Sequence, residues 1–183
     1  MENKKIKIKS TTVLAVIHNN VMAIGADGQA TMGSTIAKNN VKKIKKLANG
    51  KIIVGFAGST ADAFSLLDKF NEKLNKYSNN MKRSSIELAK EWRIDSHLKK
   101  LEAMMIVANN KEILTISGGG DVIEPNNDIA SIGSGSMYAQ SAAIALKKHN
   151  KNLSAEQIVK ESLLIASEIC IYTNDNIIIE KIS

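Results

Sequence analysis

A run of six apolar residues at positions 52–57, Ile-Ile-Val-Gly-Phe-Ala, constrains the fold more than any other stretch. A strand with one side in water alternates apolar and polar residues. This run has no polar position, so it predicts a strand buried on both faces. Residues 13–17, Val-Leu-Ala-Val-Ile, predict another buried strand. Such strands indicate two sheets packed together, with helices on their outer sides.

The order of the predicted elements favours antiparallel sheets. Asn19-Asn20 and Asn109-Asn110 separate pairs of strand-like runs, and asparagine tolerates the positive φ of a tight hairpin turn. Blocks of strands are followed by blocks of helices, which argues against a doubly wound parallel fold. Strands are expected at residues 12–18, 21–26, 41–47, 51–57, 103–108, 113–117, 128–132 and 176–181, and helices from Ser59, from Ser84, at 137–148 and at 154–169. We therefore predict an α+β fold, a four-layer αββα sandwich.

Capping patterns mark the starts of two of these helices. Ser59 with Asp62, and Ser154 with Gln157, have the spacing of a capping box, in which the two residues satisfy each other's backbone N–H groups. The chain of 183 residues is long enough for one domain with a substantial core. We assign residues 11–183 to this domain and residues 1–10 to a basic leader.

Composition and charge exclude several classes of protein. One cysteine excludes a disulfide framework and fits a reducing compartment. No run approaches the roughly 20 apolar residues that cross a bilayer, and the leader lacks the apolar middle of a secretory signal. We expect a cytoplasmic protein without a membrane partner, although the basic leader leaves open an organellar address in a eukaryote. Aromatic residues are only 4% of the chain, so despite the net charge of +7 a dedicated nucleic-acid binder is not expected.

Thr11 and Thr12 lie where the polar leader meets the first buried strand. Cleavage before Thr11 would leave a threonine that carries both a hydroxyl and a free α-amine. A hydroxyl is a weak nucleophile that needs a base, and an α-amine, with a pKa of about 7.7–8.0, can serve as one near neutral pH. The alternative is that both are ordinary strand threonines after a terminal tail, and on these residues alone that alternative is favoured.

Four other residues could complete such a site. A lysine cation at Lys43 would lower the pKa of the amine, and Asp27 could neutralise Lys43 if the lysine points inward. Gly55, a glycine inside a branched strand, could offer its N–H to an oxyanion, and Ser134 in a Gly-Ser-Gly turn could add a hydroxyl. Each also has an ordinary structural interpretation as a turn, surface or packing residue.

Longer blocks of sequence resemble a known family. The chain is similar to the HslV (ClpQ) family of proteasome-like peptidase subunits from Thr11 to its C-terminus. The blocks that carry the resemblance are Thr-Thr at 11–12, Ala-Asp-Gly-Gln-Ala-Thr-Met-Gly at 26–33, Asn-Val-Lys-Lys at 40–43, Gly-Phe-Ala-Gly-Ser-Thr-Ala-Asp-Ala at 55–63, Ile-Gly-Ser-Gly at 132–135 and Ile-Cys-Ile-Tyr-Thr-Asn at 169–174.

The resemblance implies an N-terminal-nucleophile hydrolase fold and a threonine peptidase. Thr11 would be the nucleophile and its own amine the base, and Asp27 and Lys43 the charged pair that tunes it. Gly55 would stabilise the oxyanion and Ser134 would be the auxiliary serine. Ser167, Cys170 and Thr173 would form a sodium-binding turn after a helix, where the negative helix end favours a cation.

The resemblance also implies an assembly and a partner. Members of the family form two stacked hexameric rings, and an HslU-type hexameric AAA+ ATPase unfolds protein substrates and feeds them in. ATP would be used by that partner, since this chain has no Walker motif.

Two features depart from the family pattern. The leader of ten residues is longer than usual, and it could be removed by attack of Thr11 on the Ser10 carbonyl or by another protease. Ser136 and Ser167 stand where the family more often has glycine. The remaining alternatives are a β-type subunit of another proteasome branch and a catalytically silent scaffold or basic binding module.

Overall fold

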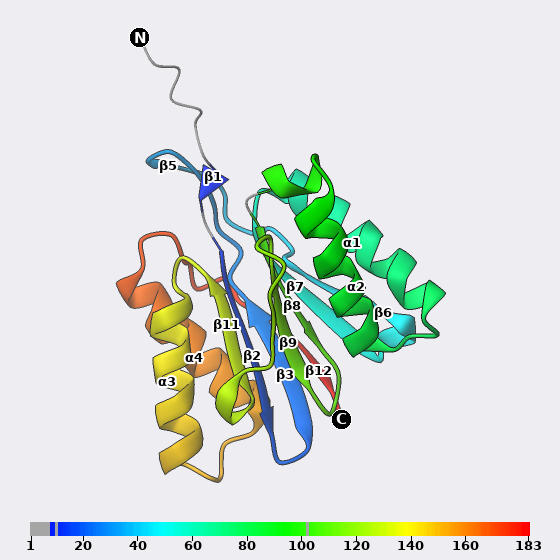
Figure 1. Ribbon diagram of the computed structural model, residues 1–183. Helices are drawn as coiled ribbons and strands as arrows, with labels where there is room; N and C mark the ends of the chain where they lie inside the picture. The colour runs from blue at the N-terminus through cyan, green and yellow to red at the C-terminus, as the bar shows by residue number, and fades with distance from the viewer. Residues whose placement is uncertain (1–7, 10, 102) are drawn as a thin grey trace.

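The protein is a four-layer sandwich in which two antiparallel sheets pack face to face between two pairs of helices (Figure 1). The structure, a computed structural model, describes residues 8–9, 11–101 and 103–183. One outer layer is formed by α1 (Thr60–Lys76) and α2 (Met81–Ile94), and the other by α3 (Ser136–His149) and α4 (Ala155–Ile169). The predicted αββα sandwich is confirmed.

The two sheets have simple antiparallel orders. The smaller is β11-β2-β3-β12 and the larger is β10-β9-β8-β7-β6. Their strands are β2 (Thr12–His18), β3 (Val21–Ala26), β6 (Ile44–Leu47), β7 (Ile52–Gly58), β8 (Ala103–Ala108), β9 (Ile113–Ser117), β10 (Val122–Ile123), β11 (Ile129–Gly133) and β12 (Ile178–Ile182). Short 3₁₀ turns lie at Ala48–Gly50, Leu98–Lys100 and Asn126–Asp128.

A small third sheet lies at one end of the sandwich. It consists of β1 (Ile8–Lys9), β4 (Ala30–Met32) and β5 (Thr35–Lys38), in the order β1-β4-β5. Figure 1 shows it beyond the ends of the two main sheets, on the side where the chain begins. The backbone returns from this sheet at Val41, whose N–H donates to the Gly28 carbonyl oxygen at 2.8 Å. Residues 28–41 therefore form a loop beside the end of β3 that this hydrogen bond closes. We call this loop the excursion.

Apolar residues form a core between each pair of layers. Val13, Ile24 and Ile53 lie between the two sheets, and their side chains are fully buried. Phe70 and Trp92 lie between the larger sheet and its helices. A third cluster fills the space between the smaller sheet and α3 and α4. Burial of β2 and β7 on both faces explains why their sequences lack polar alternation.

Three local predictions are wrong in detail. The strand expected from residue 41 begins at Ile44, because residues 41–43 still connect the excursion to the larger sheet. The second helix begins at Met81, ahead of Ser84, because Asn80 caps it by accepting the Arg83 N–H at 2.9 Å. Ser59 precedes α1 but makes no side-chain capping hydrogen bond.

Other local predictions are confirmed. The capping box of Ser154 and Gln157 has both of its hydrogen bonds. Asn19 and Asn20 both adopt a positive φ in the hairpin between β2 and β3, as the turn requires. Within the described ranges, no helix is long and apolar enough to cross a membrane.

An ion-pair cluster joins α1 to α2, and its pH dependence is testable. Glu91 on α2 pairs with Lys73 and with Lys69, both on α1, and hydrogen bonds from these lysines lower the pKa of Glu91 below 4.5. A carboxylate with a lowered native pKa stabilises the fold above its unfolded pKa, and this contribution is lost as the pH falls through the native pKa.

We expect Glu91→Gln to lower the free energy of unfolding by less than about 1 kcal/mol at pH 7, since the cluster is partly exposed. The difference from the unmodified protein should shrink as the pH falls below 4.5. Urea denaturation at several pH values measures this, with Glu124→Gln, from the exposed pair of Lys82 and Glu124, as the control. A difference that grew on acidification would contradict the assignment.

Candidate active site

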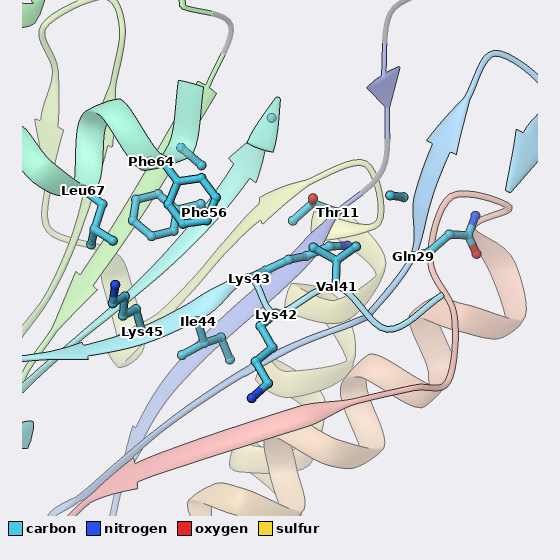
Figure 2. A pocket seen from close by; sticks show the side chains of 13 residues that line it. Thr11, Gln29, Val41, Lys42, Lys43, Ile44, Lys45, Phe56, Phe64 and Leu67 are labelled. Atoms are coloured by element: carbon cyan, nitrogen blue, oxygen red, sulfur yellow. The ribbon is translucent and has the colours of Figure 1, made fainter. Parts of the chain in front are cut away.

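Thr11 lies at the entrance to the smaller sheet, directly before β2, and only 4% of its surface is exposed. It lines a cavity of about 310 Å³ between the two sheets and α1 (Figure 2). Phe56 from β7 and Phe64 and Leu67 from α1 supply an apolar wall of this cavity. A bound molecule in the cavity would therefore contact both Thr11 and an apolar surface.

A buried ion pair lies beside Thr11. The Lys43 ammonium is 2.8 Å from the Asp27 carboxylate, and the two side chains are 6% and 0% exposed. In Figure 2 the Lys43 side chain runs beneath Thr11 from its strand-like segment. Asp27 follows β3 and Lys43 precedes β6, so the pair also links the two sheets at this end. The predicted partnership of these two residues is confirmed, and the catalytic role of the pair stays a prediction.

Asp27 is held by backbone N–H groups as well as by the lysine. Its Oδ1 accepts the N–H of Thr12 at 2.7 Å, and its Oδ2 accepts the N–H groups of Gln29 at 2.9 Å and Asn174 at 3.4 Å. Both carboxylate oxygens therefore have hydrogen-bond donors although the side chain is 0% exposed. These contacts fix the carboxylate beside the Lys43 ammonium.

Burial lowers the pKa of Lys43 below 10.5, and the negative charge and hydrogen bond of Asp27 partly oppose this shift. Burial disfavours the charged form of a lysine because the protein interior solvates an ammonium less well than water does. The site thus contains a cation in a poorly solvated place, where its field acts strongly on neighbouring titratable groups.

The Gly-Ser-Gly turn contacts the backbone of Thr11. The Ser134 N–H donates to the Thr11 carbonyl oxygen at 2.8 Å. Gly133 has a φ of +97°, and a Cβ there would lie 1.9 Å from the same oxygen, so only glycine permits this approach. Ser134 itself is exposed and begins the turn from β11 into α3. The structure therefore brings the backbone of Ser134 to Thr11, and the predicted role of the Ser134 hydroxyl stays a prediction.

Thr12 occupies a different environment from Thr11. Its side chain is fully buried, accepts the Gly135 N–H at 3.0 Å, and hydrogen-bonds the Thr173 hydroxyl at 2.7 Å. It does not line the cavity. Of the two adjacent threonines, Thr11 is therefore the one that a ligand in the cavity can reach.

Gly55 lies in the middle of β7 and does not line the cavity. It pairs with Ile44 on one side and Ile106 on the other. A Cβ at this position would come within 2.6 Å of Val13 Cγ1, so glycine here lets the two sheets approach. Its predicted role as an oxyanion donor stays a prediction, and Gly58 is the glycine that lines the cavity.

Ser167, Cys170 and Thr173 lie at the C-terminal end of α4 and in the turn that follows. The Ser167 hydroxyl donates to the Leu164 carbonyl oxygen, and the Thr173 N–H donates to the Cys170 carbonyl oxygen at 3.0 Å. Within the described ranges no group of three or more His, Cys, Asp or Glu residues could hold a metal. A sodium site built from carbonyl oxygens at a negative helix end would need none of these side chains.

Several residues of the site have no signal in the sequence pattern. Asn174 accepts the Gly28 N–H at 2.9 Å and donates to the Asn39 carbonyl oxygen at 2.9 Å, which clamps the base of the excursion. Gln29 donates to the Ile171 carbonyl oxygen at 2.9 Å. Only the resemblance of the Ile-Cys-Ile-Tyr-Thr-Asn block could have drawn attention to this region. Phe64 lies outside the periodic apolar face of its helix and was missed for that reason.

Comparisons with known proteins agree with this geometry. A family model described as "Proteasome subunit" matches residues 8–182. The ATP-dependent protease subunit HslV of Amoebophilus asiaticus is 69% identical over 97% of this chain and 99% of its own length. The protein of the same name from Cytophaga hutchinsonii is 67% identical over 95% and 97%.

Solved structures show the same relationship. The crystal structure of eukaryotic HslV from Trypanosoma brucei is similar with a TM-score of 0.88 and 39% identity, covering 93% of this chain and 98% of that one. Thiobacillus denitrificans BPH, 21% identical with a TM-score of 0.74 over 94% and 97% of the two chains, shares the fold. The chain therefore belongs to the proteasome subunit family, in its HslV group.

Proposed function

We propose that the chain is the peptidase subunit of an ATP-dependent protease and that Thr11, once exposed as the N-terminus, is its nucleophile. The observation that carries the proposal is the position of Thr11, between an accessible cavity and the buried pair of Lys43 and Asp27. The names of the HslV relatives support the ATP-dependent protease. The family membership supports a proteasome-like peptidase.

The reaction would proceed through an ester of Thr11. Its hydroxyl oxygen bonds to the scissile carbonyl carbon while the hydroxyl proton passes to the Thr11 α-amine, which then protonates the leaving nitrogen. Water attacks the ester with the same amine as base, and the acid product leaves. The Lys43 ammonium lowers the pKa of the amine by charge repulsion, which keeps more of it in the basic form at neutral pH.

The cavity suits an apolar side chain of the substrate. Phe56, Phe64 and Leu67 would bury it next to the reacting carbonyl, and apolar burial stabilises binding without fixing a single residue type. A peptidase that receives unfolded polypeptides needs this tolerance, because it must cleave many different sequences. Uncharged, strongly polar residues at this position should be disfavoured.

The assembly and the partner are also part of the proposal. We infer a homo-oligomer of two stacked hexameric rings, located in the cytoplasm, that receives unfolded polypeptide from an HslU-type AAA+ ATPase. A sodium ion would be held by the turn that contains Ser167, Cys170 and Thr173, where its positive charge would attract the carbonyl oxygens of that turn and hold them in place. The relatives named as subunits of an ATP-dependent protease support the partner.

Processing of the leader tests the proposal directly. We expect the active protein to begin at Thr11, because only cleavage there frees the α-amine that serves as base. Intact mass measurement with N-terminal sequencing of the assembled protein reads the start of the chain. Peptidase activity in a chain that retains Met1 would contradict the mechanism, and a trimmed chain without activity would point to a silent scaffold. Most of residues 1–10, including Ser10 at the cleavage point, lie outside the described residues.

A further inference from the structure

Two threonine hydroxyls form a hydrogen bond in the protein interior, outside the cavity that Thr11 lines. Thr12 Oγ1 lies 2.7 Å from Thr173 Oγ1, although the two residues are 161 positions apart in the chain. Thr12 is 0% exposed and Thr173 is 4% exposed. Neither residue lines the cavity, so the hydroxyl pair does not contact a molecule bound there. Its effect on the reaction must be exerted through the residues that it holds.

The backbone at Gly135 is shaped around this hydroxyl pair. The Gly135 N–H donates to Thr12 Oγ1 at 3.0 Å. A Cβ at Gly135 would lie 2.4 Å from Thr12 Oγ1 and 2.6 Å from Thr173 Oγ1, so any other residue would force the hydroxyls apart. Since one hydroxyl can donate one proton and accept two, Thr12 can satisfy both partners at once.

The same contacts reach both sides of the proposed nucleophile. Ser134, next to Gly135, donates its N–H to the Thr11 carbonyl oxygen. The Thr12 N–H donates to Asp27 Oδ1, the oxygen that also accepts from Lys43. Thr12 is therefore tied through its backbone to the ion pair and through its side chain to the turns after β11 and α4.

We propose that Thr12 and Thr173 are positioning residues that act as one unit to orient Thr11. The hydroxyl pair fixes the turn of Ser134 and the turn after α4 against residue 12, and so sets the direction of the backbone from which the Thr11 amine and hydroxyl project. This inference rests on the proposed role of Thr11 as nucleophile. A displacement of about 1 Å at a reacting group can cost roughly 100-fold in rate, so the link should affect turnover rather than binding.

The test compares valine and serine at both positions. Valine keeps the branched shape and suits a buried strand, but it removes the hydroxyl; serine keeps the hydroxyl. We expect Thr12→Val and Thr173→Val each to lower kcat by roughly 10- to 100-fold with KM changed by less than about threefold. Thr12→Ser and Thr173→Ser should each keep kcat within about threefold of the value for the unmodified protein. All variants are assayed as the assembled protein with its ATPase on a fluorogenic peptide, after mass measurement shows that they begin at Thr11.

A matched control separates positioning from general stability. The Ser131 hydroxyl donates to the Val13 carbonyl oxygen at 2.8 Å and so also links β11 to β2, away from the Ser134 turn. Ser131→Ala should leave kcat within about twofold. If Ser131→Ala lowers kcat as much as the valine variants, or if the valine variants raise KM alone, the positioning role is overturned.

A double-variant cycle tests whether the two hydroxyls act together. The effects of substituting residues that act as a unit are not additive. The kcat of the double variant, Thr12→Val with Thr173→Val, should therefore lie within about threefold of the kcat of the slower single variant. Multiplied losses would overturn the pairing. Activity that survives in Thr11→Ala would refute the proposed nucleophile, whereas an inactive Thr11→Ala beside fully active valine variants would refute only the positioning role.

Discussion

Thr11→Ala is expected to abolish peptide cleavage while the chain still folds and assembles. The substitution removes the hydroxyl that would form the ester, and loss of a catalytic nucleophile commonly costs at least about 10³-fold in kcat. Thr11 precedes β2 and belongs to the wall of the cavity, so removing its hydroxyl and methyl group should change the free energy of unfolding by less than about 1 kcal/mol. Peptidase assays combined with gel filtration measure both properties.

Thr12→Ala is the matched control for this prediction, since it removes the same atoms one residue further on. We expect it to lose roughly 10- to 100-fold in kcat with the Thr12 hydroxyl, and still to remain clearly more active than Thr11→Ala, because the Thr12 side chain faces the interior instead of the cavity. If Thr12→Ala were dead and Thr11→Ala active, the nucleophile would be wrong by one residue.

The same variant shows how the leader is removed. If Thr11 cleaves its own chain by attack on the preceding carbonyl, Thr11→Ala should retain Met1 even when it assembles. If another protease makes the cut, the alanine variant should be trimmed like the unmodified chain. The mass of the purified variant distinguishes the two routes, which the residues around Ser10 leave open.

The layered fold could be predicted from the sequence because its cause is local. Runs such as 52–57 have no polar position, and a strand of this kind needs cover on both faces. The Asn19-Asn20 hairpin and the Ser154 cap are likewise set by neighbouring residues, and both are confirmed. Ser59 shows the limit of such patterns: the spacing of a capping box is present, but its capping hydrogen bond is absent.

Contacts within the site could be predicted from the residues only where a buried charge requires a partner of opposite charge. A lysine that points inward needs a carboxylate, and the sequence offers Asp27 as a possible partner for Lys43. The pairing of Thr12 with Thr173, and the clamp made by Asn174, had no comparable signal. A neutral hydroxyl or amide can be satisfied by many groups, so its partner across more than 100 residues is set by the packing of whole layers.

Lys43→Met should inactivate the protein and also destabilise it. The methionine has a similar length but no charge, so the α-amine of Thr11 would lose the cation that lowers its pKa, and Asp27 would remain as a buried carboxylate. We expect kcat/KM at pH 7 to fall by at least about 100-fold, the scale of a lost catalytic base. The free energy of unfolding should fall by about 3 kcal/mol, the lower end for a broken buried pair, since backbone N–H groups still hold Asp27.

A matched control and a pH series decide the cause of this effect. Lys46→Met breaks the exposed pair of Lys46 with Glu180 and should cost less than about 1 kcal/mol without loss of activity. Because burial lowers the native pKa of Lys43, the native protein releases this proton before the unfolded chain does at 10.5. Between those two pKa values, stability relative to Lys43→Met should therefore rise with pH. The difference in activity between the two proteins should narrow at alkaline pH, because the α-amine is then unprotonated even without the cation. An activity loss in Lys43→Met that stayed equally large at alkaline pH, where the amine is uncharged without a cation, would mean that Lys43 supports the fold alone.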